Sequence, residues 1–377
     1  MREKSETLTS TSKIVIVLAL IACISIPLAH FLPTAQKIAP GDYEKRVCAF
    51  YYTWYGNTTA YPGENPSTNT TLLHWQENGH DPISDPWNIS SAQHPTLDSG
   101  DILIYDSGDP YAIRYHLDMA TYAGIDTFIC TWWGQNGYED YNFRQVLDIT
   151  ETDGYDMQHT VYFETVQDRF RENESGCVDE LYDDLSYIYD NYGNHSKFLN
   201  IYDEQLGRNR PVIFVYSTFA RPSVANWTTV VNRLHENDKY PFLIADLGGP
   251  KAVPSDYVGL FDGIHVYNPL GLYRDEPEAA LQKFETMTLS GRFHGMLTCV
   301  TTLPGYNDTQ VRDGVTALPR ENGEIYKESW DVANAVNPDW ALICTFNEWH
   351  EGTEIEPSWE NGTYYINATK EYIRQFK

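Results

Sequence analysis

The stretch DPYAIRYHLDMATYAGIDTFICTWW (residues 109–133) joins a helix-like segment directly to a strand-like one. Proline stands at its second position and Gly124 closes the first part, which is the arrangement that helices prefer at their two ends. The part that follows, residues 124–133, is continuously apolar rather than alternating. Such a run is typical of a parallel strand covered on both faces. The stretch therefore predicts an α/β architecture.

The same alternation repeats along the chain. Further helix-like segments span residues 141–154, 177–193, 223–238, 276–291 and 326–336. We expect eight strands, each ending in aromatic or polar residues, at 47–56, 124–133, 159–166, 210–217, 241–248, 261–268, 296–305 and 340–349. Eight such units predict one (β/α)8 TIM barrel. A doubly wound open sheet is the alternative, but no G-x-G-x-x-G motif follows the first strand to favour a Rossmann domain.

The N-terminal region differs from the rest of the chain. Residues 14–36 contain no Asp, Glu, Lys or Arg, and three basic residues precede them. This pattern predicts a membrane segment with a cytoplasmic N-terminus and an exported remainder. Cys23 ends a lipoprotein-like LIAC box, but the apolar run continues beyond it, which favours an uncleaved anchor over a secreted or lipoprotein form. The expected divisions are a cytoplasmic N-terminus at 1–13, a transmembrane anchor or signal segment at 14–32, a linker at 33–46 and one catalytic domain at 47–377.

The chain is strongly acidic, with a formal net charge of -27. This charge argues against a nucleic-acid partner, which requires a basic surface. Sequons of the form N-x-S/T agree with export and with a glycoprotein. They begin at Asn57, Asn69, Asn88, Asn173, Asn194, Asn226, Asn307, Asn361 and Asn367.

The cysteines show no paired spacing. Four of them lie in apolar strand-like runs, where a buried free thiol is the usual state, namely Cys48, Cys130, Cys299 and Cys344. Neither a disulfide framework nor a CxxC zinc motif is indicated. We therefore expect no cofactor and no metal.

Aromatic and acidic residues gather where the expected strands end. In a TIM barrel these ends share one face, which carries the chemistry. They include Tyr52, Trp54, Tyr55, Trp132, Trp133, Glu164, Tyr216, Asp246, His265 and Tyr267. Aromatic rings stack on sugar rings, and carboxylates bind sugar hydroxyls. The pattern favours a carbohydrate site, although any single Trp could equally belong to the core.

The last expected strand leads into TFNEWHEGTEIEPS (residues 345–358), which contains four glutamates. If the chain turns near Phe346, Glu348 and Glu351 can both face the barrel mouth beside Asn347. Paired carboxylates are what glycoside hydrolysis requires, and their repulsion raises one pKa. An exposed acidic loop is the plain alternative, and a metal site through His350 is another. No HExxH or HxxEH spacing supports zinc. Glu354 and Glu356 are expected to be supporting or solvated.

Four segments resemble the endo-α-mannosidases and endo-α-1,2-mannanases of glycoside hydrolase family 99. They are FYYTWYG (50–56), YDSGDPYAIRYHLDMATYAGIDTFICTWWG (105–134), LPGYNDTQVR (303–312) and FNEWHEGTEIEP (346–357). The likeness runs from about residue 47 to 358. The last segment is partly shared with the WbsX-like proteins of polysaccharide gene clusters, whereas the first two favour family 99.

The resemblance implies a (β/α)8 barrel and a retaining mechanism without an enzyme nucleophile. Glu348 would act as base on the 2-hydroxyl of the substrate, which attacks C1 and forms a 1,2-anhydro sugar. Glu351 would be the acid and then the base. Glu164 and Tyr267 match positions near the sugar next to the cleaved bond. Tyr52, Tyr55, Trp132, Asn347 and His350 would line the site, and Arg312 would bind substrate or support its loop.

The sequence also departs from the family. Extra residues separate the HP-x-L element from YDSGDP within residues 94–110. The substrate therefore stays open between an α-mannan, a glucosyl-mannose cap and a surface glycan of the organism itself. The expected function is an anchored, extracytoplasmic, endo-acting α-glycosidase with an oligosaccharide or polysaccharide substrate. The alternatives are a carbohydrate-binding or polysaccharide-assembly protein on the same barrel, or a structural surface protein.

Overall fold

The computed structural model describes residues 43–57, 72–96, 102, 104–171, 176–314 and 317–377. Among these residues, eight parallel strands close into a barrel. They are β1 (Arg46–Tyr51), β2 (Thr127–Trp132), β3 (Gln158–Phe163), β5 (Arg208–Val215), β6 (Phe242–Asp246), β7 (Gly263–His265), β8 (Leu297–Thr302) and β9 (Trp340–Ile343). Each expected strand corresponds to one of them, so the sequence-based prediction of a (β/α)8 barrel is confirmed.

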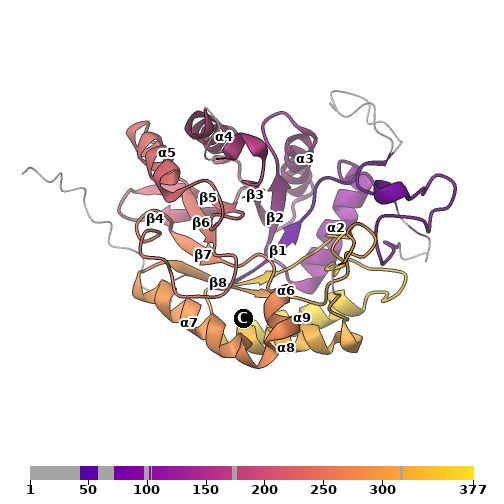
Figure 1. Ribbon diagram of the computed structural model, residues 1–377. Helices are drawn as coiled ribbons and strands as arrows, with labels where there is room; N and C mark the ends of the chain where they lie inside the picture. Colours follow the sequence, from indigo (N-terminus) through magenta and orange to yellow (C-terminus); the bar gives the residue numbers. More distant parts are fainter. Residues whose placement is uncertain (1–42, 58–71, 97–101, 103, 172–175, 315–316) are drawn as a thin grey trace, which may run out of the picture. The chain divides into compact units, whose positions relative to one another are not determined.

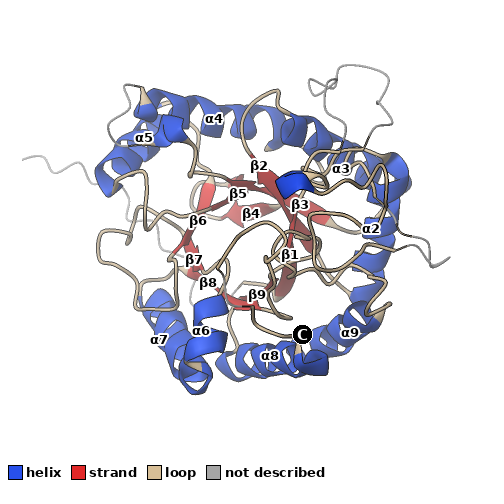
Figure 2. Ribbon diagram, turned by 45° about the vertical axis from the view of Figure 1, so that its right-hand side comes forward, coloured by secondary structure: helices blue, strands red, loops and turns tan. Residues whose placement is uncertain are grey.

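The ring closes at two pairings that join strands distant in sequence. Arg46 of β1 is in register with Trp340 of β9, and Val161 of β3 is in register with Ile213 of β5. Figure 2 shows the strands as an inner ring inside the helices. Because each barrel strand runs in the same direction, the segments that follow the strands meet on one face of the barrel.

Helices surround the barrel, as Figure 1 shows. Their bounds are α2 (Pro110–Ala123), α3 (Tyr138–Asp153), α4 (Cys177–Tyr192), α5 (Val224–Glu236), α6 (Leu270–Asp275), α7 (Ala280–Phe293), α8 (Glu324–Val336) and α9 (Tyr364–Phe376). The six helix-like segments of the sequence correspond to α2, α3, α4, α5, α7 and α8. Two further helices, α6 and α9, were not expected. The apolar stripe of α9 buries Tyr365, Ile366, Thr369, Ile373 and Phe376, and this helix packs beside α2.

The helix-to-strand unit at 109–133 folds as its end signals indicate. Asp109 caps α2 by accepting a hydrogen bond from the Tyr111 amide at 2.8 Å, and Pro110 occupies the first helical position. Gly124 ends the helix with a φ of 85°, a conformation that favours glycine. Every residue of β2 is buried. The continuous apolar run is therefore explained by cover on both faces of the strand.

One strand was not expected. β4 (Asn200–Asp203) pairs antiparallel with the start of β5 as a hairpin outside the barrel ring. Asp203 Oδ1 accepts hydrogen bonds from the amides of Gln205 and Leu206, both at 3.0 Å, and so fixes the turn. The polar sequence of this hairpin carries no apolar run, because its residues are partly exposed.

The expected membrane segment at 14–32, the N-terminus at 1–13 and Cys23 lie outside the described residues. At the end of the expected linker, the Tyr43 ring packs edge-on against Phe242 with 6.1 Å between ring centroids. In the part of the chain that the structure describes, no helix is long and apolar enough to cross a membrane. The described cysteines are all buried free thiols, which confirms the expectation for the four in strand-like runs.

Side chains fill the barrel interior. Phe50 of β1 and Phe214 of β5 are fully buried, with 6.5 Å between their ring centroids. The ring centroid of His265 of β7 lies 5.2 Å from that of Phe214, and His265 Nε2 is 3.1 Å from the hydroxyl of Tyr162. This packed layer forms the floor beneath the face where the strands end.

Candidate active site

The acidic segment after β9 turns sharply back on itself. The Thr345 amide donates to the Thr353 carbonyl at 2.9 Å, and the Glu356 amide donates to the Phe346 carbonyl at 2.9 Å. The Glu348 amide donates to Thr345 Oγ1 at 2.8 Å. These bonds end the strand and fold residues 345–356 over the barrel mouth, as the sequence required for the two acids to share a face.

Glu348 is buried and its carboxylate is incompletely satisfied. Glu348 is 1 % exposed, and its Oε2 has no hydrogen-bond partner among the described residues. Burial, and then the nearby charge of Glu351, raise the pKa of Glu348 well above its usual range. A buried carboxylate oxygen without a partner is costly in a folded protein, and such groups are concentrated at functional sites.

Glu351 lies at the same place with more polar neighbours. Its Oε2 accepts hydrogen bonds from the Tyr267 hydroxyl at 3.3 Å and from Asn268 Nδ2 at 3.2 Å. Its Oε1 lies 3.3 Å from Arg312 Nη1. Burial raises the pKa of Glu351, and the Arg312 charge opposes that increase. The two acids therefore sit in different environments, which is how one site obtains two protonation roles.

Tyr52 and Tyr267 join this pair from opposite sides of the barrel. Their hydroxyls lie 2.5 Å apart, so one hydrogen bond connects the segment after β1 to the segment after β7. Both residues are almost fully buried, and the Tyr267 hydroxyl also contacts Glu351. The structure thus brings together Tyr52, Tyr267, Arg312, Glu348 and Glu351, as expected from the sequence.

Glu164 adds a third acid from the end of β3. It is 4 % exposed, and its pKa is raised well above its usual range by burial and then by the charges of Asp246 and Glu351. The electrostatic coupling to Glu351 places it near the acid pair. It was expected to border the site from its position at a strand end.

Asn347 is a support rather than a wall of the site. It is fully buried, and its Oδ1 accepts from the Tyr52 amide at 2.6 Å. Its Nδ2 donates to the Tyr52 carbonyl at 3.0 Å and to the Tyr105 hydroxyl at 3.2 Å. The amide is therefore occupied by protein groups, and it positions Tyr52 instead of contacting a ligand as expected.

The model of the family described as glycosyl hydrolase family 99 matches residues 42–369. This chain belongs to glycoside hydrolase family 99. The resemblance seen in its sequence is confirmed, and the chain is a glycoside hydrolase.

Curated relatives of this family 99 chain include mammalian enzymes. Rat glycoprotein endo-alpha-1,2-mannosidase is 28% identical over 358 residues, covering 88% of this chain and 72% of the relative. The mouse protein of the same name is 26% identical over 345 residues, covering 85% and 70%. A solved structure, the GH99 endo-alpha-mannosidase from Bacteroides thetaiotaomicron, aligns with a TM-score of 0.68. It is 23% identical and covers 88% of this chain and 97% of that chain, so it shows the shared fold.

Two expected wall residues of the family 99 barrel are fully buried. Trp132 is fully buried, and its indole N–H donates to Asp140 Oδ1 of α3 at 2.8 Å. Tyr55 is also fully buried, and its hydroxyl accepts from the Trp349 amide at 2.9 Å. Neither offers a surface to a sugar. Their burial corrects the expectation from the sequence, because Trp132 faces α3 and Tyr55 packs against the turn that carries Glu348 and Glu351.

Trp54 and Trp133 are the half-buried aromatic residues at these strand ends. Their rings stack with 6.3 Å between centroids. Both indole nitrogens are buried without a hydrogen-bond partner in the described part of the chain. Neighbouring residues in a strand face opposite sides. Alternation alone therefore predicts that only one of Trp132 and Trp133 faces the barrel mouth.

His350 belongs to a group that could in principle hold a metal ion. Its nearest donor atom and those of His74 and Glu77 all lie within 4.8 Å of one another. However, His350 Nε2 is hydrogen-bonded to the His74 carbonyl, and His74 Nδ1 lies 2.7 Å from Glu77 Oε1. Burial lowers the pKa of His350 to about 4, so this side chain is neutral near pH 7. These contacts link the turn that carries His350 to the segment at residues 72–79.

Glu354 and Glu356 hold the turn from below. Glu354 Oε1 lies 2.6 Å from Arg320 Nη2. Glu356 accepts from the Tyr105 hydroxyl at 3.0 Å and from the Trp349 indole at 3.1 Å, and its Oε1 lies 3.0 Å from His116 Nε2. Both carboxylates are buried, so their expected supporting role is confirmed and the solvated alternative is wrong.

Arg312 links a surface loop to the acid pair. Its Nη1 donates to the Tyr306 hydroxyl at 2.9 Å and lies 3.0 Å from Asp308 Oδ2, in addition to its contact with Glu351. The side chain is half exposed. It can therefore support the loop and meet a ligand at the same time.

Proposed function

We propose that this glycoside hydrolase is a retaining endo-α-mannosidase that cleaves mannose-containing glycans outside the cytoplasm. The observation that carries the proposal is the buried Glu348 carboxylate, with an oxygen that lacks a partner among the described residues, coupled to Glu351 three residues later. The curated relatives named as endo-alpha-1,2-mannosidases support the mannose-containing substrate and the endo cleavage.

In the proposed first step, Glu348 takes the proton of the 2-hydroxyl, and the 2-oxygen attacks C1 of the same sugar. The C1–O bond to the leaving sugar breaks, and Glu351 gives its proton to the leaving oxygen. In the second step, water attacks C1 and loses a proton to Glu351, the bond between C1 and the 2-oxygen breaks, and Glu348 returns its proton to the 2-oxygen. Two inversions at C1 give net retention. The mechanism departs from the usual nucleophilic carboxylate scheme.

The environments of the two acids fit these roles. Burial raises the pKa of Glu348 well above its usual range, which makes its ionised form a stronger base. Glu351 must become an anion when it protonates the leaving group. Arg312 and the hydrogen bonds from Tyr267 and Asn268 stabilise that anion.

The stereochemical outcome tests the proposal directly. The soluble part of the chain is incubated with an α-1,2-linked mannan oligosaccharide, and the anomeric proton of the new reducing end is followed by NMR. We expect the α-anomer first and a multi-sugar product by mass. A β-anomer first would contradict the retaining mechanism, and single mannose as the sole product would contradict endo cleavage.

The proposed location rests on the apolar segment at 14–32 and on the sequons. Protease treatment of intact cells tests it. We expect the catalytic domain to be cut by protease added outside while a cytoplasmic marker stays intact. Protection of the domain until the cells are lysed would contradict the proposed location.

A further inference from the structure

A cavity whose lining includes neither Glu348 nor Glu351 opens on the face where the barrel strands end. Its volume is about 680 Å³, within the range of roughly 300–1,000 Å³ that is typical of small-molecule sites. The segment after β5, residues 218–224, forms one wall, and residues of the segment after β6 form another. Arg171, at the end of the short helix η2 (Asp168–Phe170), completes it. We call this space the β5–β6 cavity.

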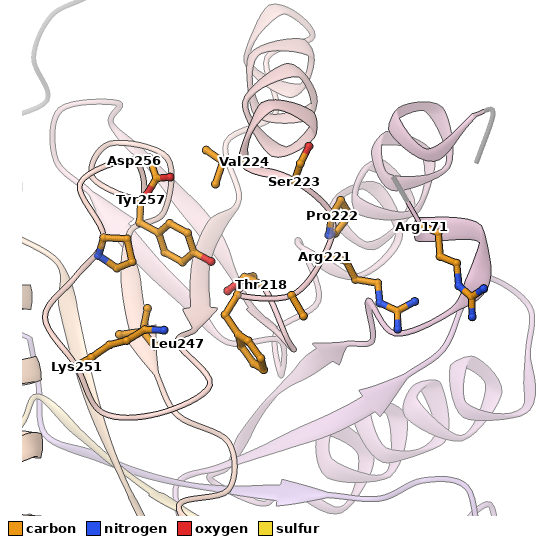
Figure 3. A pocket seen from close by; sticks show the side chains of 13 residues that line it. Arg171, Thr218, Arg221, Pro222, Ser223, Val224, Leu247, Lys251, Asp256 and Tyr257 are labelled. Carbon is orange, nitrogen blue, oxygen red and sulfur yellow. The ribbon is translucent and has the colours of Figure 1, made fainter. Parts of the chain in front are cut away.

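The β5–β6 cavity concentrates positive charge. Arg171, Arg221 and Lys251 line it, and Figure 3 shows the two arginines on one side of the view and Lys251 on the other. Within the described residues, the side chains of Arg221 and Lys251 form no hydrogen bond or ion pair. Arg171 is paired with Asp168 at 2.5 Å, and Asp256 is the acidic member of the lining, so Arg221 and Lys251 together leave a positive balance. In a chain with a net charge of -27, such a balance is unusual and points to an anionic occupant.

The start of α5 adds to the positive charge of the β5–β6 cavity. Ser223 caps the helix, and its side chain accepts from the Asn226 amide at 3.3 Å. Ser223 and Val224 both line the cavity, so the first turn of α5 borders it. The N-terminus of a helix carries a partial positive charge that favours anions. This contribution reinforces the one from the side chains.

An exposed aromatic ring lies in the same lining. Phe219 is 51% exposed, although it is a large apolar side chain. A Cβ atom added to Gly248 would lie 2.6 Å from the Phe219 ring, and Gly248 has a φ of 69°. The glycine therefore lets the ring sit where it does. An apolar face beside charged groups suits a sugar ring that carries an anionic substituent.

Asp246 ties the cavity to the acid pair. Its Oδ2 accepts from the Ser217 amide at 3.1 Å, and its Oδ1 accepts from the Tyr267 amide at 3.4 Å. Thr218, which lines the cavity, donates through its hydroxyl to the Asp246 carbonyl at 2.5 Å. Tyr267 in turn bonds to Glu351. One buried residue thus positions both the cavity wall and a residue of the active site.

We propose that the β5–β6 cavity binds an anionic substituent, a phosphate ester, sulfate ester or carboxylate, carried by the glycan that the enzyme cleaves. The inference rests on the proposed function for the identity of the glycan backbone. Arg221 and Lys251 contact the anion, and Phe219 packs against the sugar that carries it. The cavity is therefore an accessory subsite that selects charged glycans.

Binding to three matched probes tests this inference. They are a linear α-mannan oligosaccharide, the same oligosaccharide with a phosphate ester, and the same oligosaccharide with a uronic acid at its end. Isothermal titration measures Kd for the soluble part of the chain and for its R221Q/K251Q variant. A K327Q/R374Q variant removes two charges from the exposed surfaces of α8 and α9 and serves as the control.

We expect the R221Q/K251Q variant to bind at least one charged oligosaccharide about three- to tenfold more weakly, with the control unchanged. The difference should shrink as salt is added, and the neutral oligosaccharide should bind all three proteins alike. A loss confined to the phosphorylated or to the uronate probe supports the inference and identifies the anion. Equal Kd values across the three proteins for both charged probes, or an equal loss for the neutral probe, overturn it.

Cleavage of the neutral oligosaccharide is measured in parallel, so that the two proposals fail separately. Charge-selective binding without cleavage would contradict the proposed function and leave the subsite in place. Cleavage without charge-selective binding would contradict the proposed subsite and leave the proposed function in place. The side chains of Arg221 and Lys251 form no hydrogen bond or ion pair within the described residues, so their replacement should change the melting temperature little. The single variants should give intermediate losses of affinity.

Discussion

Arg312 Nη1 lies 3.3 Å from Glu351 Oε1, and this contact sets the ionisation of the proposed acid. The Arg312 charge lowers the pKa of Glu351, against the effect of burial. In R312Q that opposing effect is lost, so the pKa of Glu351 should rise. A general acid must be protonated, so the alkaline limb of kcat/KM should move to higher pH.

The R312Q profile is measured on an α-1,2-mannan oligosaccharide and compared with K327Q, which removes an exposed charge on α8. The alkaline limb of K327Q should coincide with that of the wild type. A limb that moves to lower pH in R312Q would show that Arg312 does not act on the acid through its charge.

The two acids should respond differently to the leaving group. E348Q and E351Q should each lower kcat on an oligosaccharide by about a hundredfold to ten-thousandfold, because each removes a proton transfer. An α-mannosyl fluoride bears a leaving group that needs no protonation. On it, the first step should recover in E351Q but not in E348Q, since the base is still required.

Fluoride release in a single turnover measures this recovery. Recovery in E348Q and not in E351Q would reverse the assignment of the two roles. E371Q, which changes an exposed glutamate on α9, is the control and should match the wild type.

Neighbouring tryptophans on β2 should have separable effects. Trp133 is half buried with an unpartnered indole nitrogen in the described part of the chain, so W133A should raise KM with little change in melting temperature. Trp132 is fully buried, so W132A should lower the free energy of unfolding by about 3–5 kcal/mol. Denaturant unfolding and steady-state kinetics on both variants measure the two quantities. A KM effect confined to W132A would contradict the orientation of β2.

Glu354 should make stability depend on pH. Burial raises its pKa from the usual 4.5 to about 7, although Arg320 opposes this. The folded protein then binds more protons at this residue than the unfolded chain does between pH 4.5 and 7. The stability contribution is therefore complete below pH 4.5 and is lost as the pH rises to 7.

E354Q removes that dependence, because glutamine does not titrate. The difference in unfolding free energy between wild type and E354Q should shrink by about 3 kcal/mol on going from low to neutral pH. Urea unfolding at several pH values gives this difference. A constant difference would show that Arg320 keeps Glu354 ionised throughout.

Much of the fold could be read from local patterns. The 109–133 unit carried its proline, its closing glycine and its apolar run, and α2 and β2 form there. α9 was not expected, although residues 365, 366, 369, 373 and 376 recur at helical spacing. The β4 hairpin lacked a signal because a half-exposed edge strand has no apolar run.

The candidate site was predictable to the level of residue types at strand ends. Glu348 and Glu351 could be paired from the sequence because a turn after β9 brings residues three apart to one side. Tyr52 and Tyr267 lie 215 residues apart in sequence, and barrel closure alone sets their hydroxyls 2.5 Å from each other. Neither periodicity nor composition can give such a contact.

By itself, the sequence determined the eight barrel strands, six of the helices around them, the acid pair and the family. These depend on local periodicity and on short motifs, which each segment carries whatever its neighbours do. The tertiary structure decided which side each strand-end residue faces. Trp132 faces α3, and the Asn347 amide is hydrogen-bonded to Tyr52. Glu354 and Glu356 are buried beneath the turn. The reason is that facing and burial depend on what packs against a residue, and in a closed barrel those partners come from distant parts of the chain.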